Sequence, residues 1–211
     1  MPRRIEVIVI DPDAAYSALL KTILPTAPGM GKVSLYSNLK AAVEVSRGGT
    51  FPGVVLADIK GCSNPSSFVK GMRTGFPEAA ILIVSQCNDE DSIAACLQAG
   101  ASGYLLKKAP LATICDAVEE AHAGGCPLCP QVARKVARWF HAHRTAPQPP
   151  PNLSRREDEI LTMVANGAKN REIAANLGLS EATIRAHLQR TYKKLNVTSR
   201  FQAVAGRRKR S

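Results

Sequence analysis

The chain has 211 residues and a formal charge of +11, and 45% of its residues are hydrophobic while 21% are charged. This composition is ordinary for folded globular proteins and excludes a disordered chain. The apolar runs have the length of strands, which excludes transmembrane helices, and no signal-peptide-like segment follows the basic start. We therefore expect a cytoplasmic protein.

Strand-like and helix-like segments alternate through the first two thirds of the chain. Strands are predicted at 5–10, 32–36, 53–57, 80–85 and 103–106. Helices are predicted at 14–24, 38–46, 65–74, 89–99 and 111–123, with a further helix at about 130–143. This alternation predicts an α/β fold with a five-stranded, doubly wound parallel sheet.

Polar side chains follow four of the predicted strands. Asp11 and Asp13 follow the first strand, and Asp58 follows the third. Ser85 ends the fourth strand, and Lys107 follows the fifth. Because the carboxyl ends of parallel strands meet at one edge of a sheet, we expect these side chains to lie together. The three carboxylates can hold Mg²⁺, and the ammonium and hydroxyl groups can contact a phosphoryl group.

Residues 5–124 resemble the receiver domain of a two-component response regulator. The matching segments are Val-Ile-Val-Ile-Asp11, Val-Val-Leu-Ala-Asp58, Ile-Leu-Ile-Val-Ser85 and Gly-Ala-Ser-Gly-Tyr-Leu-Leu-Lys107. The resemblance implies that Asp58 accepts a phosphoryl group from a sensor histidine kinase, with Mg²⁺ as cofactor. It also implies that Lys107 and Ser85 contact the phosphoryl oxygens and that Tyr104 moves when the domain switches.

The acidic residues depart from the receiver pattern in one respect. Receivers usually carry two adjacent acids after the first strand, and Pro12 stands in the second position here. A receiver that works without phosphorylation is therefore one alternative. Another is a phosphatase of the haloacid dehalogenase type, in which Asp11 is the nucleophile and Asp13 the general acid.

Two of the six cysteines, Cys126 and Cys129, have CxxC spacing, which could suit zinc or redox chemistry. There is no second CxxC pair, and free thiols are the simpler interpretation in a reducing compartment.

A proline-rich stretch, Pro147–Pro151, predicts an extended linker. From Asn152 onward there are 13 Lys and Arg against 5 Asp and Glu, whereas the preceding residues hold 15 and 12. A strongly basic smaller part predicts nucleic-acid binding, and no amphipathic anchor supports a membrane surface instead. We predict domains over 1–126 and 153–211, the latter with a basic tail, joined by a linker helix and proline-rich linker over 127–152.

After the linker only helical signals remain. Ser154 can cap a helix and form a capping box with Glu157, and Gly167 can end that helix. Gly178 suits a turn that needs a positive φ, and Ser180 can cap the following helix. A turn glycine and caps at these offsets predict a helix-turn-helix, which makes the second domain all-α.

The second helix of this motif carries the predicted base contacts. Arg185 and Gln189 are four residues apart and share a face, so they can hydrogen-bond guanine and adenine in the major groove of double-stranded DNA. Further contacts, most of them to phosphates, are predicted for Lys169, Asn170, Thr183, Ala186 and Lys193.

Residues 153–205 resemble the LuxR-type DNA-binding domain of NarL/FixJ regulators. The matching segments are Leu-Ser-Arg-Arg-Glu157, Arg-Glu-Ile-Ala174, Leu-Ser-Glu-Ala-Thr-Ile-Arg-Ala-His187 and Tyr-Lys-Lys-Leu-Asn-Val-Thr-Ser-Arg200. The resemblance implies that the last helix, from Ser199 to about Ala205, forms a homodimer on DNA. The sequence therefore predicts a phosphorylation-switched transcription factor rather than an enzyme.

Overall fold

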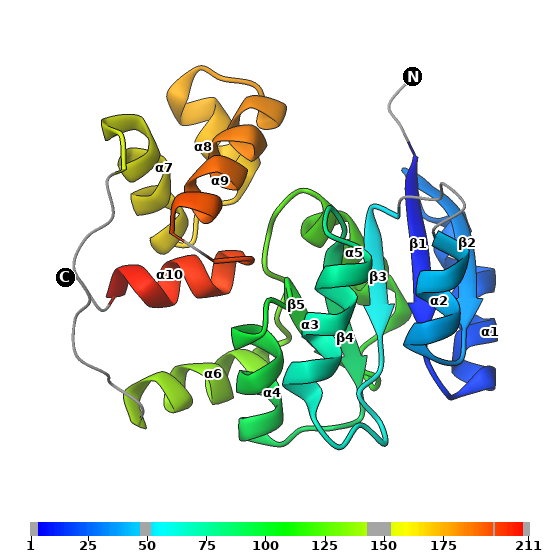
Figure 1. Cartoon of the computed structure of the whole chain (residues 1–211). Coiled ribbons are helices and arrows are strands. Elements are labelled where there is room, and N and C mark those ends of the chain that lie inside the picture. Colours follow the sequence, from blue (N-terminus) through cyan, green and yellow to red (C-terminus); the bar gives the residue numbers. More distant parts are fainter. Residues whose placement is uncertain (1–3, 47–51, 143–152, 196, 209–211) are drawn as a thin grey trace.

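The computed structural model describes residues 4–46, 52–142, 153–195 and 197–208. The proline-rich linker and the basic side chains at the C-terminal end lie outside this description. The described residues form a sheet domain, from β1 to α5, and a helical domain, from α7 to α10, with α6 following the sheet domain in the chain (Figure 1). None of the described helices is both long enough and apolar enough to cross a membrane.

The sheet domain has five parallel strands in the order β2-β1-β3-β4-β5. The strands are β1 (Ile5–Ile10), β2 (Met30–Tyr36), β3 (Val54–Ala57), β4 (Ala80–Ser85) and β5 (Gly103–Leu106). The helices are α1 (Ala14–Ile23), α2 (Leu39–Ser46), α3 (Pro65–Gly75), α4 (Glu90–Gln98) and α5 (Leu111–His122), with a short 3₁₀ turn, η1, at Leu24–Thr26. The predicted fold class is confirmed, and element ends differ from the prediction by one or two residues.

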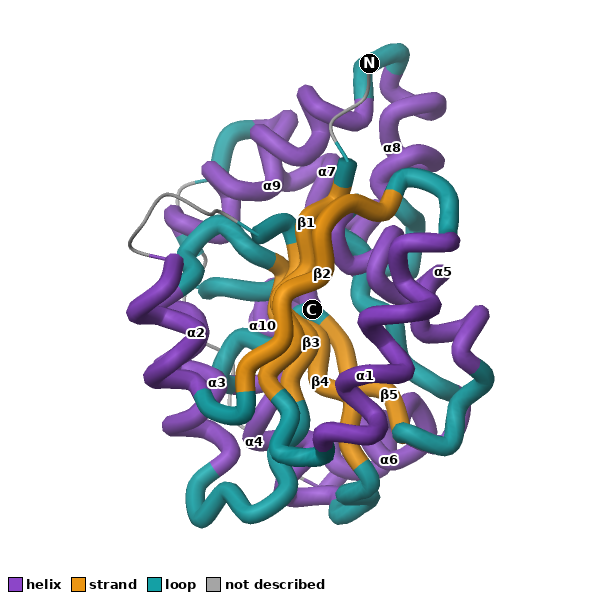
Figure 2. Tube along the Cα trace, turned by 90° about the vertical axis from the view of Figure 1, so that its right-hand side faces the viewer, coloured by secondary structure: helices purple, strands orange, loops and turns teal. Residues whose placement is uncertain are grey.

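Helices cover both faces of the sheet, with α1 and α5 on one face and α2, α3 and α4 on the other (Figure 2). Successive residues of a strand point to opposite faces. Val7 and Val9 of β1 therefore pack with α1 and α5, whereas Ile8 and Ile10 pack in the cluster that includes α3 and α4. Because both faces are buried, the strands are almost continuously hydrophobic.

Helix α6 (Pro130–Ala142) packs against α4 and β5. Val132 is completely buried, and Val136 and Phe140 join the same hydrophobic cluster. Just before the helix, the Pro127 carbonyl accepts a hydrogen bond of 3.0 Å from the Tyr104 backbone N–H of the edge strand β5. The segment expected to begin the linker is thus attached to the sheet domain.

The helical domain consists of α7 (Arg155–Ala165), α8 (Asn170–Leu177), α9 (Glu181–Lys194) and α10 (Arg200–Arg208). The predicted capping box at the start of α7 is present, as is the Ser180 cap of α9. Gly178 adopts φ +64° between α8 and α9, a conformation that favours glycine. The expected helix-turn-helix is confirmed, and α10 extends three residues beyond its predicted end.

The capping-box carboxylate also contacts α9. Glu157 Oε2 accepts hydrogen bonds of 2.7 Å from both Lys194 Nζ and the Ser154 backbone N–H. These two donors lower the pKa of Glu157 from 4.5 to about 2. Because the folded-state pKa lies below the ordinary value, this stabilisation is complete above pH 4.5 and is lost as the pH falls towards 2.

We expect Glu157→Ala to lower the free energy of opening of α7 by about 1 kcal/mol at pH 7, because a cap and an ion pair are lost. Amide hydrogen exchange of α7 and α9 in the full chain measures this, and the difference from wild type should shrink as the pH falls below 4.5. Glu159→Ala is the matched control, since its ion pair with Arg156 is exposed. A difference that is independent of pH would contradict the assigned role of the charge.

Candidate functional site

Four of the predicted polar residues meet at the carboxyl edge of the sheet. Lys107 Nζ lies 2.6 Å from Asp11 Oδ2 and 2.8 Å from Asp58 Oδ2. Ser85 Oγ donates a hydrogen bond of 2.5 Å to Asp58 Oδ1, which also accepts one of 2.9 Å from the Lys60 backbone N–H. Asp11, Asp58 and Ser85 are at most 5% exposed. We call Asp11, Asp58, Ser85 and Lys107 the acid pocket.

Burial and charge act against each other in the acid pocket. Burial raises the pKa of Asp11, although Lys107 and the Asp13 backbone N–H act to lower it. Burial would lower the pKa of Lys107, but the hydrogen bonds and charges of Asp11 and Asp58 together raise it above its ordinary value. The ammonium therefore stays charged and is the counter-charge of both carboxylates.

The structure does not bring Asp13 to the other two carboxylates. Asp13 Oδ1 accepts hydrogen bonds of 3.1 Å from the backbone N–H groups of Ala15 and Tyr16, so this side chain caps α1. These hydrogen bonds lower the pKa of Asp13. Among the described residues there is no group of three or more His, Cys, Asp or Glu that could hold a metal ion. The acid pocket thus offers two carboxylates.

Tyr104 connects the acid pocket to the loop between β4 and α4. Its side chain is completely buried, and its hydroxyl donates a hydrogen bond of 2.8 Å to the Cys87 carbonyl. Burial raises the pKa of Tyr104. The Cys87 backbone N–H donates to Ser85 Oγ, so Ser85 and Tyr104 hold the same loop.

The CxxC pair shows free thiols at Cys126 and Cys129. Cys126 packs against the hydrophobic core, and burial raises its pKa to about 12. At neutral pH it is therefore a protonated thiol, the form that is neither a good metal ligand nor a good nucleophile.

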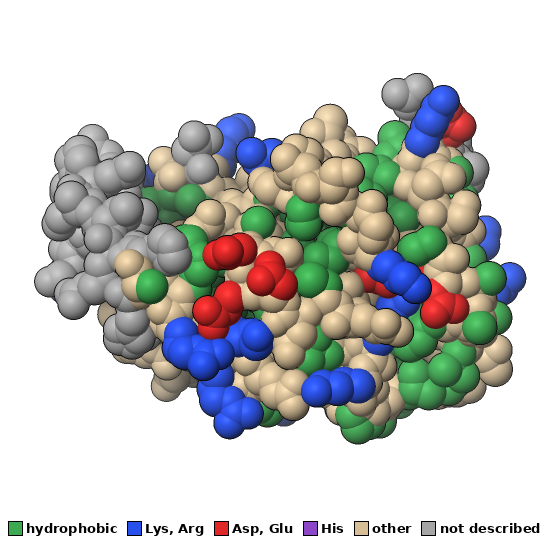
Figure 3. All heavy atoms as spheres, turned by 90° about the horizontal axis from the view of Figure 1, so that it is seen from below, with side chains coloured by type: hydrophobic (Ala, Val, Ile, Leu, Met, Phe, Trp, Pro, Cys, Tyr) green, Lys and Arg blue, Asp and Glu red, His purple; other side chains and the backbone are tan. Residues whose placement is uncertain are grey.

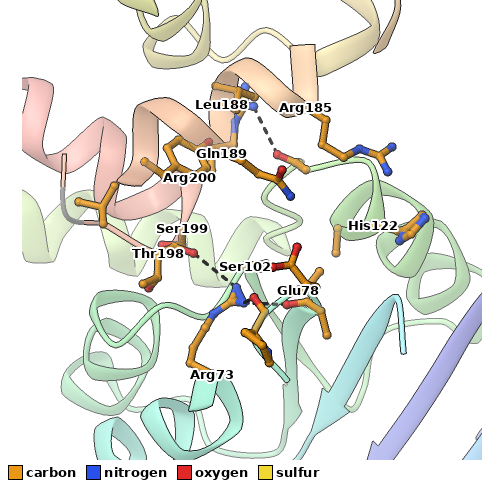
Figure 4. A pocket seen from close by; sticks show the side chains of 18 of the residues that line it. Arg73, Glu78, Ser102, His122, Arg185, Leu188, Gln189, Thr198, Ser199 and Arg200 are labelled. Atoms are coloured by element: carbon orange, nitrogen blue, oxygen red, sulfur yellow. Dashed lines mark hydrogen bonds between the residues drawn. The ribbon is translucent and has the colours of Figure 1, made fainter. Parts of the chain in front are cut away.

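The helix expected to contact bases faces the sheet domain. Arg185, Gln189 and Lys193 lie along one side of α9 and line a cavity of about 790 Å³ between the two domains (Figure 4). His122, at the end of α5, lines the same cavity, and burial together with the nearby Arg185 charge lowers its pKa. The Arg185 Nε atom is buried without a hydrogen-bond partner among the described residues.

Two of the other residues predicted to contact DNA contact the sheet domain, and a third contacts a helix-capping residue. Asn170 Nδ2 donates to the Ala123 carbonyl of the sheet domain, and Lys169 Nζ lies 3.9 Å from Glu120. Thr183 is engaged with Ser180, the cap of α9. Ala186 lies in the middle of α9 and is half-buried.

Two arginines that the sequence analysis did not single out join the domains. Arg73 of α3 donates hydrogen bonds to the carbonyls of Ala79 (2.7 Å) and Gly100 (3.2 Å) in its own domain, and of Thr198 (3.4 Å) in the helical domain. These contacts appear as dashed lines in Figure 4 where both partners are drawn. No sequence signal marks Arg73, because its acceptors are backbone carbonyls, and those of Gly100 and Thr198 are distant in the chain.

Arg200, at the start of α10, makes the reciprocal contacts. It donates to the Gly124 carbonyl of the sheet domain at 3.4 Å, and within its own domain to Asn170 Oδ1 at 3.3 Å and to the Ala168 carbonyl. The rings of Phe201 and Phe140 lie 5.2 Å apart, so α10 also packs against α6 (Figure 1). We call these contacts, together with those of Arg73 and Asn170, the domain seam.

Comparisons with known protein families agree with this two-part architecture. The family model described as "Response regulator receiver domain" matches residues 7–119. The model described as "Bacterial regulatory proteins, luxR family" matches residues 151–205.

Curated relatives match along nearly the whole chain. Transcriptional regulatory protein LnrK of Bacillus subtilis (strain 168) is 30% identical over 208 residues, which cover 94% of each protein. Nitrate/nitrite response regulator protein NarL of Escherichia coli (strain K12) is 28% identical over 200 residues, covering 93% of this chain and 92% of NarL.

Solved structures share the fold. RcsB from Salmonella enterica serovar Typhimurium, bound to promoter P1flhDC in the presence of phosphomimetic BeF3-, superposes with a TM-score of 0.59 at 18% identity. The match covers 99% of this chain and 100% of RcsB. At this identity the likeness concerns the fold alone.

We expect Arg73→Ala to weaken the domain seam, because the hydrogen bond to Thr198 is lost and three carbonyls of the sheet domain, those of Pro77, Ala79 and Gly100, lose this donor. One such bond is worth about 1 kcal/mol, or about fivefold in the ratio of associated to separated domains. Small-angle X-ray scattering of the full chain should show a larger radius of gyration.

Lys70→Ala is the control for Arg73→Ala, since Lys70 is an exposed residue of the same helix whose side chain is absent from the seam. Thermal unfolding of both variants separates loosening of the seam from loss of the sheet domain. An Arg73→Ala scattering profile identical to that of wild type would contradict the assigned role.

Proposed function

Because the chain belongs to the NarL/FixJ family of DNA-binding transcriptional response regulators, we propose that phosphorylation of Asp58 by a sensor histidine kinase controls its binding to double-stranded DNA. The observation that supports the phosphoacceptor most directly is the environment of Asp58. It is buried at the carboxyl end of β3, with Lys107 at one carboxylate oxygen and Ser85 at the other.

The transfer step follows from these contacts. A carboxylate oxygen of Asp58 attacks the phosphorus of the kinase phosphohistidine; the P–O bond forms, the P–N bond breaks, and the electron pair returns to the imidazole nitrogen, which takes up a proton. Lys107 is placed to pair with the phosphoryl oxygens and Ser85 to donate a hydrogen bond to one of them. The Lys60 backbone N–H orients the carboxylate before the reaction.

Mg²⁺ is the cofactor that receivers typically use, and the donor set of the acid pocket fits it. Mg²⁺ is commonly held by one or two carboxylates together with phosphate oxygens and water, and Asp11 and Asp58 supply two. When bound, the ion neutralises charge on the transferring phosphoryl group. We therefore assign Asp11 and Asp58 as its ligands and Asp13 to the cap of α1.

DNA binding requires the domains to separate. A major groove admits a helix only when its contacting side is free, and Arg185, Gln189 and Lys193 of α9 face the cavity between the domains. Helix α10, expected to form the homodimer on DNA, is held by Arg200 and Phe201 against the sheet domain and α6. We propose that phosphorylation shifts the equilibrium towards separated domains, which then bind DNA as a dimer in the cytoplasm.

A second candidate keeps the DNA-binding function but not the phosphorylation. It is favoured by Pro12, which replaces the second of the two adjacent acids usual in receivers, and by the capping role of Asp13. The phosphatase alternative gains no support, because it needs Asp13 as a general acid beside Asp11, and Asp13 Oδ1 is engaged by two backbone N–H groups instead.

Incubation of the full chain with acetyl phosphate and Mg²⁺ should add one phosphoryl group to the wild type and none to Asp58→Ala, as read by intact mass. Asp91→Ala is the control, since this exposed acid at the start of α4 lies outside the acid pocket and should still be modified. An unmodified wild type would support the phosphorylation-independent candidate.

We expect Arg185→Ala to cost about 1–3 kcal/mol of binding free energy on a specific site and to relax selectivity at one base pair. Affinities for an operator found by genome-wide footprinting and for random DNA measure this at fixed salt. Arg190→Ala is the control, because Arg190 is exposed and its only described hydrogen bond is to the Ala186 carbonyl of its own helix. An equal loss on both DNAs would make Arg185 a phosphate contact.

A further inference from the structure

The Lys107 ammonium has a third partner besides its two carboxylates. Its Nζ atom lies 4.5 Å from the centroid of the Tyr16 ring, within the range of a cation–π contact. The Tyr16 hydroxyl is buried without a hydrogen-bond partner among the described residues. The part of Tyr16 that contacts Lys107 is thus its ring face and not its hydroxyl group.

Asp13 connects the backbone of Tyr16 to the acid pocket. The Asp13 backbone N–H donates a hydrogen bond of 2.8 Å to Asp11 Oδ1, and Asp13 Oδ1 accepts from the Tyr16 backbone N–H at 3.1 Å. The first turn of α1 is therefore tied to the acid pocket at one end and carries Tyr16 at the other. Asp13, whose carboxylate does not reach the acid pocket, therefore positions Tyr16 beside it.

The charge of the acid pocket is correspondingly low. Asp11, Asp58 and Lys107 together carry one net negative charge, and an adjacent acid in place of Pro12 would make it two. The face seen from the carboxyl ends of the strands carries both acidic and basic side chains, with one group of acidic side chains next to a group of basic ones (Figure 3). A divalent cation is attracted less strongly by such a site.

We propose that Tyr16 is a positioning residue that holds the Lys107 ammonium between Asp11 and Asp58, so that this ammonium competes with Mg²⁺ for the two carboxylates. The proposal rests on the proposed function, in that it concerns the metal used in phosphorylation of Asp58. It describes the pocket before phosphorylation, however, and is measured without any transfer reaction. Tyr16 acts through Lys107 and touches neither the phosphoryl group nor the metal.

Isothermal titration of the unphosphorylated full chain with MgCl₂ tests the competition. Tyr16→Leu removes the ring and should tighten Mg²⁺ binding by about 3- to 30-fold, the range expected for a lost cation–π contact. Tyr16→Phe keeps the ring and should bind Mg²⁺ as the wild type does. Leu19→Ala, at an exposed residue of the same helix, controls for a general effect on α1.

A double-mutant cycle with Lys107→Gln separates positioning from a structural effect. In that background the ammonium is absent, so Tyr16→Leu should no longer change the affinity for Mg²⁺. Tyr16→Met provides a second ring deletion if Tyr16→Leu does not fold, as judged by circular dichroism.

Four results would overturn the proposal. They are an unchanged affinity in the ring deletions, an equal change in Tyr16→Phe, an equal change in the Lys107→Gln background, and Mg²⁺ binding that is undetectable in every variant. Intact mass after acetyl phosphate, measured separately, reports on phosphorylation itself, so failure of the proposed function is distinguishable from failure of this inference.

Discussion

The ammonium of Lys107 between the carboxylates of Asp11 and Asp58 is the interaction on which the rest of the sheet domain depends. Three charges are buried at the ends of three parallel strands, and removing one partner from such a group costs about 3–5 kcal/mol because the others stay unpaired. The same three charged side chains also form the site of the proposed phosphorylation. In the proposed phosphorylated state, the phosphoryl group on Asp58 adds oxygens that Lys107 and Ser85 can contact, so the partners of both side chains would change together.

A continuous set of contacts leads from this pocket to the helical domain. Ser85 and Tyr104 hold the loop between β4 and α4 through the two backbone groups of Cys87. The backbone of Tyr104 in turn holds Pro127, the segment that leads into α6, and Phe140 of α6 packs against Phe201 of α10. A displacement of Ser85 can therefore change how α10 packs against α6, because the loop between β4 and α4, β5 and α6 connect the two. No direct contact between the acid pocket and α9 is needed for this.

The sequence predicted those features that depend on local patterns or on general rules of the fold. Strand positions and the Ser154 and Gly178 signals are local, and the meeting of Asp58, Ser85 and Lys107 follows from the geometry of any parallel sheet. The direction of Asp13 was not predictable, because it depends on how the backbone leaves Pro12 and which N–H groups are within reach. The contacts of the domain seam were not predictable either. Arg73 and Arg200 donate hydrogen bonds to backbone carbonyls, and because every residue has a carbonyl, no sequence pattern marks the acceptors.

The composition of the seam explains how closed domains can still open. Its described contacts are mostly single hydrogen bonds to carbonyl groups, together with the buried Phe201 ring, which packs in the hydrophobic cluster of the sheet domain. The polar contacts can be replaced by hydrogen bonds to water when the domains separate. In the closed arrangement Arg185 Nε is buried and has no hydrogen-bond partner among the described residues. In the proposed DNA complex Arg185 and Asn170 contact the DNA, and in this structure both face the sheet domain, so the closed and the proposed DNA-bound states compete for the same groups. Under the proposed function, a modest change at the acid pocket would shift the balance between these two states.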